Sequence, residues 1–374
     1  METERKLRIC VIDPNNTIEY TYGLLMALSE KNLVTYVTKK TYNSNMPLVN
    51  VKKYFYGDNT KSKVYMGINY IFTYIRIFLL LNREKYDVIH IQWFKIEGLD
   101  KYLVGILKRK TKIVYTAHNV LPHINGENKK GKYDALYNEV DSIIVHGQAI
   151  KNELLREFTI DDNKIFIQPY GFSLLEGNAI KEKSTFVYEV MSRKKKYKKI
   201  VMCLGLINRY KGTDRILKIW NQVLGNSSNL LVIAGKINEH FKELDTEIER
   251  KASNVIVEDR HLTDSEFSEL SKIADLIVLP YRNASMSGVV YSAARAKTPI
   301  LTTKTGTIPE YLENGIDSII VDNTDDSIEK ALLKALNEND DCLKEMGRKL
   351  YLNFQNKYQW DVIADNLVKG CYLR

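Results

Sequence analysis

A glycine and two cations follow an apolar run in Leu204–Gly212, which reads LGLINRYKG. Gly205 lets the backbone turn sharply off a strand, and Arg209 and Lys211 bring two positive charges to the place where that strand ends and a helix begins. A diphosphate would fit such a site. The segment is not a P-loop of the GxxxxGK[ST] type, because Tyr210 stands where that pattern needs a glycine. The alternative interpretation is a surface turn with two solvated cations.

A second segment could form the other wall of an anion site. An apolar strand is followed by Pro280 and Tyr281, then by Ser285–Gly288, which is rich in small residues, and then by an alanine-rich helix that begins near Val289 and is ended by Lys297–Pro299. Small residues at a helix start let a phosphate approach the backbone N–H groups and the positive end of the helix dipole. The two segments together therefore predict a site for a phosphate-bearing ligand.

Strands and helices must position these segments, and the apolar pattern predicts where they lie. Short runs rich in Val and Ile alternate with stretches of helical periodicity, which is typical of buried parallel strands crossed over by helices. The sequence therefore predicts an α/β protein with two Rossmann-like, doubly wound parallel-sheet domains, with ligands at the carboxyl ends of the strands in a cleft between the domains. The predicted strands read LRICVID, LVTYVTK, DVIHIQWF, KIVYTAHNV, SIIVHG and KIFIQPYG in the first domain, and KIVMCLGL, NLLVIAGK, NVIVEDR, DLIVLPY, PILTTK and SIIVD in the second.

The alternation breaks across Ser173–Lys199, which we interpret as the linker. The predicted domains are residues 1–180 and 181–357. The basic run RKKKYKK at Arg193–Lys199 is interpreted as a solvated connector rather than a binding patch. The apolar stretch Val64–Leu81 is barely of spanning length and contains an arginine, so a buried helix under the first sheet is favoured over a membrane segment.

The composition is that of a globular protein with acidic partners. The length of 374 residues favours two domains, and 44% hydrophobic with 27% charged residues excludes a disordered or fibrous chain. The net charge of +9 favours acidic partners, namely phosphate-bearing small molecules, anionic lipid head groups or nucleic acid, and charge alone does not choose among them. The aromatic and glycine signatures of RNA-binding modules are not apparent, so no nucleic-acid partner is expected. The scattered cysteines have no zinc-site spacing and the start of the chain has no signal core, so we expect a cytoplasmic protein.

The order of several motifs resembles that of a known family, the GT-B glycosyltransferases of family 4. The resemblance extends from Asp87 to Asn314, and no single motif decides it. Its motifs are HIQWF (His90–Phe94), TAHNVLPH (Thr116–His123), VHGQAIKNEL (Val145–Leu154), the RYKG turn, the VLPY strand, the SGV helix start, KTPILTT and GTIPEYLENG.

This resemblance implies roles for particular residues. Arg209 and Lys211 correspond to the basic pair that grips the donor diphosphate and stabilises charge on the leaving group. His118 corresponds to the histidine that faces the transferred sugar, although by position alone a satisfied core histidine is the alternative. The implied catalytic residues are thus His118, Arg209 and Lys211, and the implied donor-binding residues are Gly205, Arg209, Lys211, Tyr281, Ser287, Gly288, Val289 and Ser292.

One departure from the family concerns an acidic pair, E-x7-E, which in relatives contacts the donor sugar and the ribose. Ala284 and Ser292 stand at those positions. A serine can hydrogen-bond a ribose hydroxyl but lacks the charge that shortens and strengthens such a contact. Glu310 matches a frequent family position, and its alternative interpretation is a helix-start residue.

The chemistry implied is transfer of a sugar from a UDP- or GDP-linked donor to a hydroxyl, with retention, in surface polysaccharide synthesis. The resemblance implies no cofactor and no metal, since lysine and arginine supply the countercharge. It also implies that the last segment, residues 358–374, forms a helix that packs back on the first domain through Trp360, Val362, Ile363 and Leu367. The alternatives are a nucleotide-sugar epimerase of the same fold, which would need acids that Asn283–Ser292 lacks, and a non-catalytic partner subunit.

The acceptor is expected at loops of the first domain, as a glycan or a lipid-linked glycan. The polar stretch HINGENKKGK at His123–Lys132 is interpreted as a mobile loop, with a disordered connection as the alternative. A shallow contact with the anionic inner face of the membrane through basic residues such as Lys108–Lys110 would suit a lipid-linked acceptor. The candidate acceptor-binding residues are Asn15, Gln92, Trp93 and His123.

Overall fold

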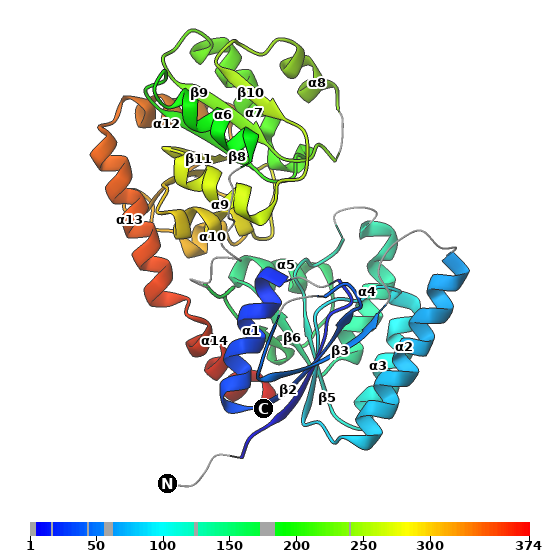
Figure 1. The fold of residues 1–374 in the computed structure, drawn as a ribbon. Helices are drawn as coiled ribbons and strands as arrows, with labels where there is room; N and C mark the ends of the chain where they lie inside the picture. The colour runs from blue at the N-terminus through cyan, green and yellow to red at the C-terminus, as the bar shows by residue number, and fades with distance from the viewer. Residues whose placement is uncertain are drawn as a thin grey trace. The chain divides into compact units, whose positions relative to one another are not determined.

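The chain folds into two compact units (Figure 1). Unit 1 comprises Met1–Ser173 together with Tyr358–Arg374, and unit 2 comprises Leu174–Lys357. The computed structural model describes residues 5–15, 18–42, 45–55, 63–122, 126–172, 184–238 and 241–374. The boundary predicted between residues 180 and 181 falls outside these described ranges.

Unit 1 is built on a parallel sheet of seven strands, in the order β3-β2-β1-β4-β5-β6-β7. The order reverses beside β1, so β1 and β4 flank the switch point at which ligands of doubly wound sheets bind. The inner strands are mostly short apolar runs, buried because helices cover both faces, whereas the edge strand β3 contains two lysines and is only partly buried. The strands are β1 (Arg8–Ile12), β2 (Leu33–Lys39), β3 (Val49–Phe55), β4 (Val88–Ile91), β5 (Lys112–Thr116), β6 (Ser142–Val145) and β7 (Ile165–Ile167).

Helices cover both faces of this sheet. Alternate residues such as Ile12 and Ile91 pack in one apolar core with Tyr74, Val104 and Leu136 from three helices on one face. The first and last helices of the unit lie together on the other face (Figure 1). The helices of unit 1 are α1 (Ile18–Lys31), α2 (Lys63–Arg83), α3 (Glu97–Lys108), α4 (Gly126–Glu139), α5 (Gln148–Glu157), the short 3-10 helix η1 (Asp162–Lys164), α14 (Trp360–Leu367) and the π-helical turn η4 (Val368–Tyr372).

Helix α14 packs on α1, far from it in sequence. The Trp360 indole lies 5.2 Å from the Tyr20 ring, centroid to centroid, and it passes so close to Gly23 and Gly171 that a Cβ on either glycine would overlap it. The Tyr372 hydroxyl lies 2.7 Å from Nδ1 of His90 in β4. Of the four apolar residues expected to face the first domain, Trp360, Ile363 and Leu367 are buried, whereas Val362 is 50% exposed.

Unit 2 has a parallel sheet of six strands, in the order β10-β9-β8-β11-β12-β13. Its switch point lies between β8 and β11. Strands β9 and β10 continue the sheet on the β8 side, and β12 and β13 continue it on the β11 side. This arrangement in both units confirms the predicted fold class. The strands are β8 (Ile200–Leu204), β9 (Leu230–Ala234), β10 (Val255–Glu258), β11 (Leu276–Leu279), β12 (Ile300–Thr303) and β13 (Ser318–Val321).

The helices of unit 2 also lie on both faces of its sheet. One apolar core joins β8, β9 and β11 to Leu217, Trp220, Leu244 and Leu332 on one face. The helical elements of the unit are α6 (Thr185–Arg193), η2 (Arg209–Lys211), α7 (Thr213–Ile219), η3 (Trp220–Leu224), α8 (Lys242–Glu249), α9 (Asp264–Ile273), α10 (Gly288–Ala296), α11 (Ile308–Tyr311), α12 (Asp325–Asn337) and α13 (Asp340–Lys357).

Two loop predictions were wrong in part. The segment interpreted as linker contains α6, which begins at the N-cap Ser184, whose hydroxyl accepts the Val187 N–H. The segment interpreted as a mobile loop is helical from Gly126 onward, and residues 123–125 lie outside the described part of the chain. The later turns of α4 bury Tyr133, Leu136 and Tyr137, and this packing stabilises the helix. The first turns are rich in glycine and lysine, so the sequence pattern there does not indicate a helix.

The end of the basic run is not solvated, contrary to the prediction. The Lys199 side chain is 1% exposed, donates to the backbone oxygens of Leu336 and Glu338, and forms a 3.0 Å ion pair with Asp340. This lysine therefore satisfies the carbonyls that α12 leaves at its C-terminal end.

Candidate functional site

The turn after β8 depends on two glycines with left-handed backbones. Gly205 has φ 98° and directly follows the strand, and Gly212 has φ 69° and directly follows η2. A Cβ on Gly212 would overlap the carbonyl of Pro280, which follows β11. Glycine is thus required where the η2 turn and the end of β11 meet, which is the switch point of unit 2.

Lys211 lies at the centre of this switch point. Its ammonium nitrogen is 3.5 Å from the place a Cβ on Gly205 would occupy and 5.8 Å from the centre of the Tyr281 ring. Burial lowers the pKa of Lys211 from 10.5 to about 8. In the described part of the chain, no carboxylate forms an ion pair with Lys211. The fold thus holds a half-buried cation without a countercharge, which favours the binding of an anion.

The start of α10 faces the same place. A side-chain carbon of Val289, in its first turn, lies 3.8 Å from the position of a Cβ on Gly205. The N-cap residue Ser287 makes no capping hydrogen bond, and its hydroxyl instead lies 3.0 Å from that of Tyr281. Both side chains are buried, so this pair holds the helix start against the end of β11. A helix start without a side-chain cap presents N–H groups and a positive dipole end to an anion.

Arg209 is placed differently from Lys211. Its side chain is 60% exposed, pairs with Glu243 of α8 at 3.4 Å, and lies over the Phe241 ring. Its backbone carbonyl accepts a hydrogen bond from Arg282, which also forms a bidentate pair with Asp214 at 2.6 and 2.7 Å. The structure therefore brings Gly205, Lys211, Tyr281, Ser287 and Val289 together, and it leaves Arg209 on the rim with an acidic partner.

The positions of the missing acidic pair are occupied without charge. Ala284 is 4% exposed, and its carbonyl lies where a Cβ on Gly306 would be. The Ser292 hydroxyl accepts a hydrogen bond from Arg295 at 3.3 Å within the same helix. Glu310 lies in the short helix α11, where its N–H donates to the Thr307 carbonyl. No acid replaces the pair between residues 283 and 292.

In unit 1, a buried network joins the carboxyl ends of β4, β5, β6 and β7. His118 is 8% exposed and stacks on Trp93 with ring centres 4.6 Å apart. Its Nε2 lies 3.0 Å from the Gln92 amide oxygen, and its Nδ1 lies 3.0 Å from Nε2 of His146. Nδ1 of His146 lies 3.1 Å from the backbone oxygen of Gln168. Both ring nitrogens of His118 are therefore occupied by protein groups.

Burial keeps the imidazoles of this network neutral. It lowers the pKa of His90 to about 3, that of His146 to about 4, and that of His118 well below its ordinary value. The Gln168 carbonyl only accepts hydrogen bonds, so neutral His146 carries its proton on Nδ1, and its Nε2 accepts from Nδ1–H of His118.

That proton pattern leaves Nε2 of His118 as an acceptor opposite the Gln92 amide. Turning this amide by half a turn exchanges its oxygen and nitrogen, so that its NH2 group donates to His118 and its oxygen accepts from His90. In this arrangement His90 donates to Gln92, and Gln92 donates to His118. The consequence is that His118 holds a lone pair on Nε2, and it can bind a substrate hydroxyl only by releasing Gln92.

The comparisons with known proteins agree with these two units. A family model described as glycosyltransferase family 4 matches residues 34–174, and one described as glycosyl transferases group 1 matches residues 188–351. Sucrose-phosphate synthase of Thermosynechococcus elongatus superposes with a TM-score of 0.75 at 14% identity, covering 98% of each chain. The protein is a GT-B glycosyltransferase. The family and the enzyme class predicted from the sequence are confirmed.

Other relatives of this glycosyltransferase carry more specific names. Anabaena HepE in complex with UDP-glucose superposes with a TM-score of 0.71 at 12% identity, over 98% of this chain and all of that one. D-inositol 3-phosphate glycosyltransferases of Corynebacterium kroppenstedtii and Corynebacterium diphtheriae are each 20% identical, over 79% and 78% of this chain and 71% of their own. At such identities the structural likeness shows the fold.

The predicted acceptor residues of the glycosyltransferase differ in how far they are exposed. Asn15 is exposed after β1, where its N–H donates to Asp13. Trp93 is half-buried, and His123 lies outside the described residues. Gln92 is fully buried between His90 and His118, where its amide contacts both rings and orients His118.

Sequence reasoning missed two residues at the strand ends of unit 1. Asp13 is fully buried at the end of β1 and accepts hydrogen bonds from Thr21 and Tyr36, and His146 fixes the proton of His118. Each follows an apolar run directly, as the strand ends ICVID and IIVH show. A polar residue at a strand's carboxyl end is the signal that could have identified both.

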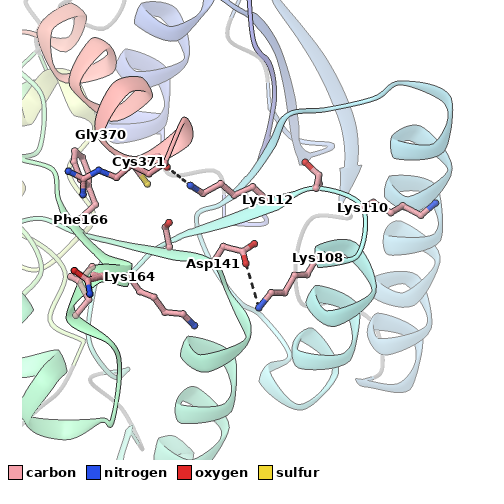
Figure 2. A pocket seen from close by; sticks show the side chains of 13 residues that line it. Lys108, Lys110, Lys112, Asp141, Lys164, Phe166, Gly370 and Cys371 are labelled. Atoms are coloured by element: carbon pink, nitrogen blue, oxygen red, sulfur yellow. Dashed lines mark hydrogen bonds and ion pairs between the residues drawn. The ribbon is translucent and has the colours of Figure 1, made fainter.

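A basic pocket of about 610 Å³ lies at the opposite, amino-terminal ends of β5, β6 and β7 (Figure 2). Three of its four lysines are engaged with helix ends, and the fourth, Lys110, donates to the Asn82 side chain. Lys108 donates to the Glu139 carbonyl, Lys164 to that of Asn138, and Lys112 to that of Cys371. These contacts satisfy the C-terminal carbonyls of α4 and η4, which accounts for these three lysines without a ligand.

Neither a cluster of metal-binding side chains nor a membrane-spanning helix is found among the described residues. No group of three or more His, Cys, Asp or Glu side chains there is arranged to hold a metal ion. None of the described helices, α2 included, is long and apolar enough to cross a bilayer.

Proposed function

We propose that this glycosyltransferase transfers a sugar from a nucleoside diphosphate carrier to a hydroxyl of a glycan or lipid-linked glycan, in surface polysaccharide synthesis. The observation that carries the proposal is the half-buried Lys211 ammonium, which has no acidic partner in the described part of the chain and adjoins an uncapped helix start. A diphosphate supplies the missing negative charge to both groups. UDP is the favoured carrier, since HepE is similar in fold and was solved with UDP-glucose.

The chemistry follows from how charge moves in such a transfer. As the bond from the anomeric carbon to the diphosphate breaks, negative charge grows on the leaving phosphate. Lys211 and the N–H groups of α10 are already in place to stabilise that charge, so they favour the transition state over the ground state. No metal or cofactor is needed in this scheme. Retention follows if the acceptor hydroxyl attacks on the face that the diphosphate leaves and gives its proton to a phosphate oxygen.

Unit 1 supplies the acceptor side in this proposal. Trp93 and the lone pair on Nε2 of His118 are the groups that a sugar hydroxyl would meet once Gln92 releases the ring. The working place of the enzyme is the inner face of the cytoplasmic membrane, where a lipid-linked acceptor is found.

A panel of nucleotide sugars tests the proposal. The protein is mixed with each donor and with acceptors that include glycans, lipid-linked glycans and D-inositol 3-phosphate, and release of nucleoside diphosphate is followed. We expect one donor to give sugar-dependent release and its nucleoside diphosphate to raise the melting temperature. Silence with every donor, together with no thermal shift by UDP or GDP, would overturn the proposal. An isomerised donor in the absence of any acceptor would show an epimerase instead.

A further inference from the structure

The outer side of two helices in unit 1 is unusually apolar. Helix α2 already buries one side under the sheet through residues such as Tyr70, Tyr74 and Ile77. Its opposite side exposes a second apolar stripe at helical spacing, with Phe72 at 57% and Leu79 at 60% exposure. Ile68, Ile71 and Ile75 complete this stripe, each more than 40% exposed. A water-facing helix side does not ordinarily consist of such residues.

Helix α3 extends this surface. Tyr102 and Ile106, one turn apart, are 69% and 46% exposed. Helices α2 and α3 lie side by side on the same face of the sheet (Figure 1), joined by the hydrogen bonds of Tyr70 and Tyr74 to the buried carboxylate of Asp100. Since both helices turn their inner sides to one sheet, their exposed sides point the same way. We define the α2–α3 face as Ile68, Ile71, Phe72, Ile75, Leu79, Tyr102 and Ile106.

Cations outnumber acids around the α2–α3 face. Helix α2 contains no Asp or Glu. The two acids of α3 are turned inward, Glu97 to an ion pair with Lys129 and Asp100 to the tyrosines of α2. The exposed charges on and directly after the two helices are the cations Arg76, Arg83, Lys85, Lys101, Arg109 and Lys110. Two partly exposed acids also border them, Glu84 after α2 and Glu139 beside Gly105 of α3, so positive charge predominates. Lys110 lies over the Phe78 ring of α2, 4.4 Å from its centre, so a cation adjoins the apolar side chains directly.

This combination selects among partners. Two copies of the face pressed together would bring like charges against each other, which disfavours a dimer through it. A bilayer with anionic lipids matches both features, because apolar side chains enter the boundary between head groups and acyl chains while arginine and lysine contact the phosphates. We infer that the α2–α3 face is the surface by which this enzyme binds anionic membranes. The inference builds on the proposed place of work and is independent of sugar transfer.

Flotation with lipid vesicles tests the inference on the full chain. We expect the wild-type protein to float with vesicles of phosphatidylcholine and phosphatidylglycerol, and not with phosphatidylcholine alone. The double variant Phe72→Ser, Leu79→Ser should bind the anionic vesicles at least about tenfold more weakly, since two inserted side chains are lost. A control double variant, Tyr188→Ser and Val362→Ser, removes equally exposed apolar residues from α6 and α14 and should bind as the wild type does.

A second variant reports insertion directly. Phe72→Trp places an indole on the face, and we expect its fluorescence to shift to the blue with anionic vesicles and to be quenched by lipids brominated in their acyl chains. Failure of the wild type to float, equal binding by the serine variant, or an unshifted indole would each overturn the inference. So would a dimer that the serine variant abolishes, with no binding to lipid. Vesicle binding without sugar transfer would leave this inference intact and count against the proposed function.

Discussion

Replacing Lys211 by methionine should stabilise unit 2 while abolishing diphosphate binding. Burial lowers the pKa of this lysine from 10.5 to about 8. At roughly 1.4 kcal/mol for each pKa unit, keeping the ammonium charged at pH 7 costs about 3 kcal/mol of folding free energy. Methionine fills a similar volume without a charge, so Lys211→Met removes this cost. A mutation that raises folding stability while it removes function is expected where a binding site keeps a charged group buried without a partner.

Thermal and chemical unfolding measure the first effect. For a unit of this size about 1 kcal/mol corresponds to roughly 2–4 °C, so we expect the melting temperature without ligand to rise by several degrees. Lys218 is exposed on α7, close in sequence, and Lys218→Met is the matched control that should change neither stability nor binding. The shift in melting temperature produced by UDP or GDP in the wild type should disappear in Lys211→Met and persist in Lys218→Met.

The pH dependence gives an independent check on the same charge. Because the folded-state pKa of Lys211 is below its unfolded value, the unfolded chain binds the extra proton between pH 8 and 10.5, and this group makes the free energy of unfolding rise with pH in that window. Binding has the opposite trend, since only the ammonium form attracts the diphosphate. We expect the affinity to be about tenfold weaker at pH 9 than at pH 7. A Lys211→Met protein that is several kcal/mol less stable, or that binds diphosphate with unchanged affinity, would refute the reasoning.

Three further predictions concern other parts of the structure. Gly212→Ala should destabilise unit 2 by at least about 2 kcal/mol in urea unfolding. The left-handed backbone is unfavourable for alanine, and the new methyl group would overlap the Pro280 carbonyl. His146→Leu should cost about 1–3 kcal/mol by leaving Nδ1–H of His118 unpaired, and His146→Gln should restore much of it, with ¹⁵N shifts of His118 reporting the proton. Glu266 has its pKa lowered to about 2, chiefly by the hydrogen bonds from Arg260, so the stability it contributes should be lost as pH falls from about 4.5 toward 2, and acid titration of Glu266→Gln should lack this component.

Much of the donor site could be predicted because its residues follow strand ends directly. The carboxyl ends of β8 and β11 are adjacent in a doubly wound sheet, so a glycine turn after one and a helix start after the other must meet. The sequence does not distinguish Lys211 from Arg209, which stand two positions apart. Their difference depends on the left-handed turn at Gly212 and on Glu243 of α8, which pairs with Arg209. Such tertiary contacts are not encoded in local spacing.

The histidine network was only partly predictable for a similar reason. His90, His118 and His146 each stand at or after the end of an apolar run, so their place at one edge of the sheet follows from the pattern. Their hydrogen bonds depend on the register between four strands and on Tyr372, which comes from the last turn of the chain. The exposed stripe of α2 was hidden in another way. A continuous apolar run of its length reads as buried, and only the observed packing shows that one side faces water.

The discontinuity of unit 1 has a consequence for how the protein is made. A ribosome releases the strands of unit 1 first and the whole of unit 2 next, and domains that emerge early generally begin to fold at once. Yet the Trp360 indole and the Tyr372 hydroxyl, which contacts His90, belong to Tyr358–Arg374, the part of unit 1 that follows unit 2 in sequence. Until those residues emerge, α14 cannot pack on α1, so apolar side chains of α1 stay exposed to solvent. During this interval we expect chaperones to bind the nascent unit.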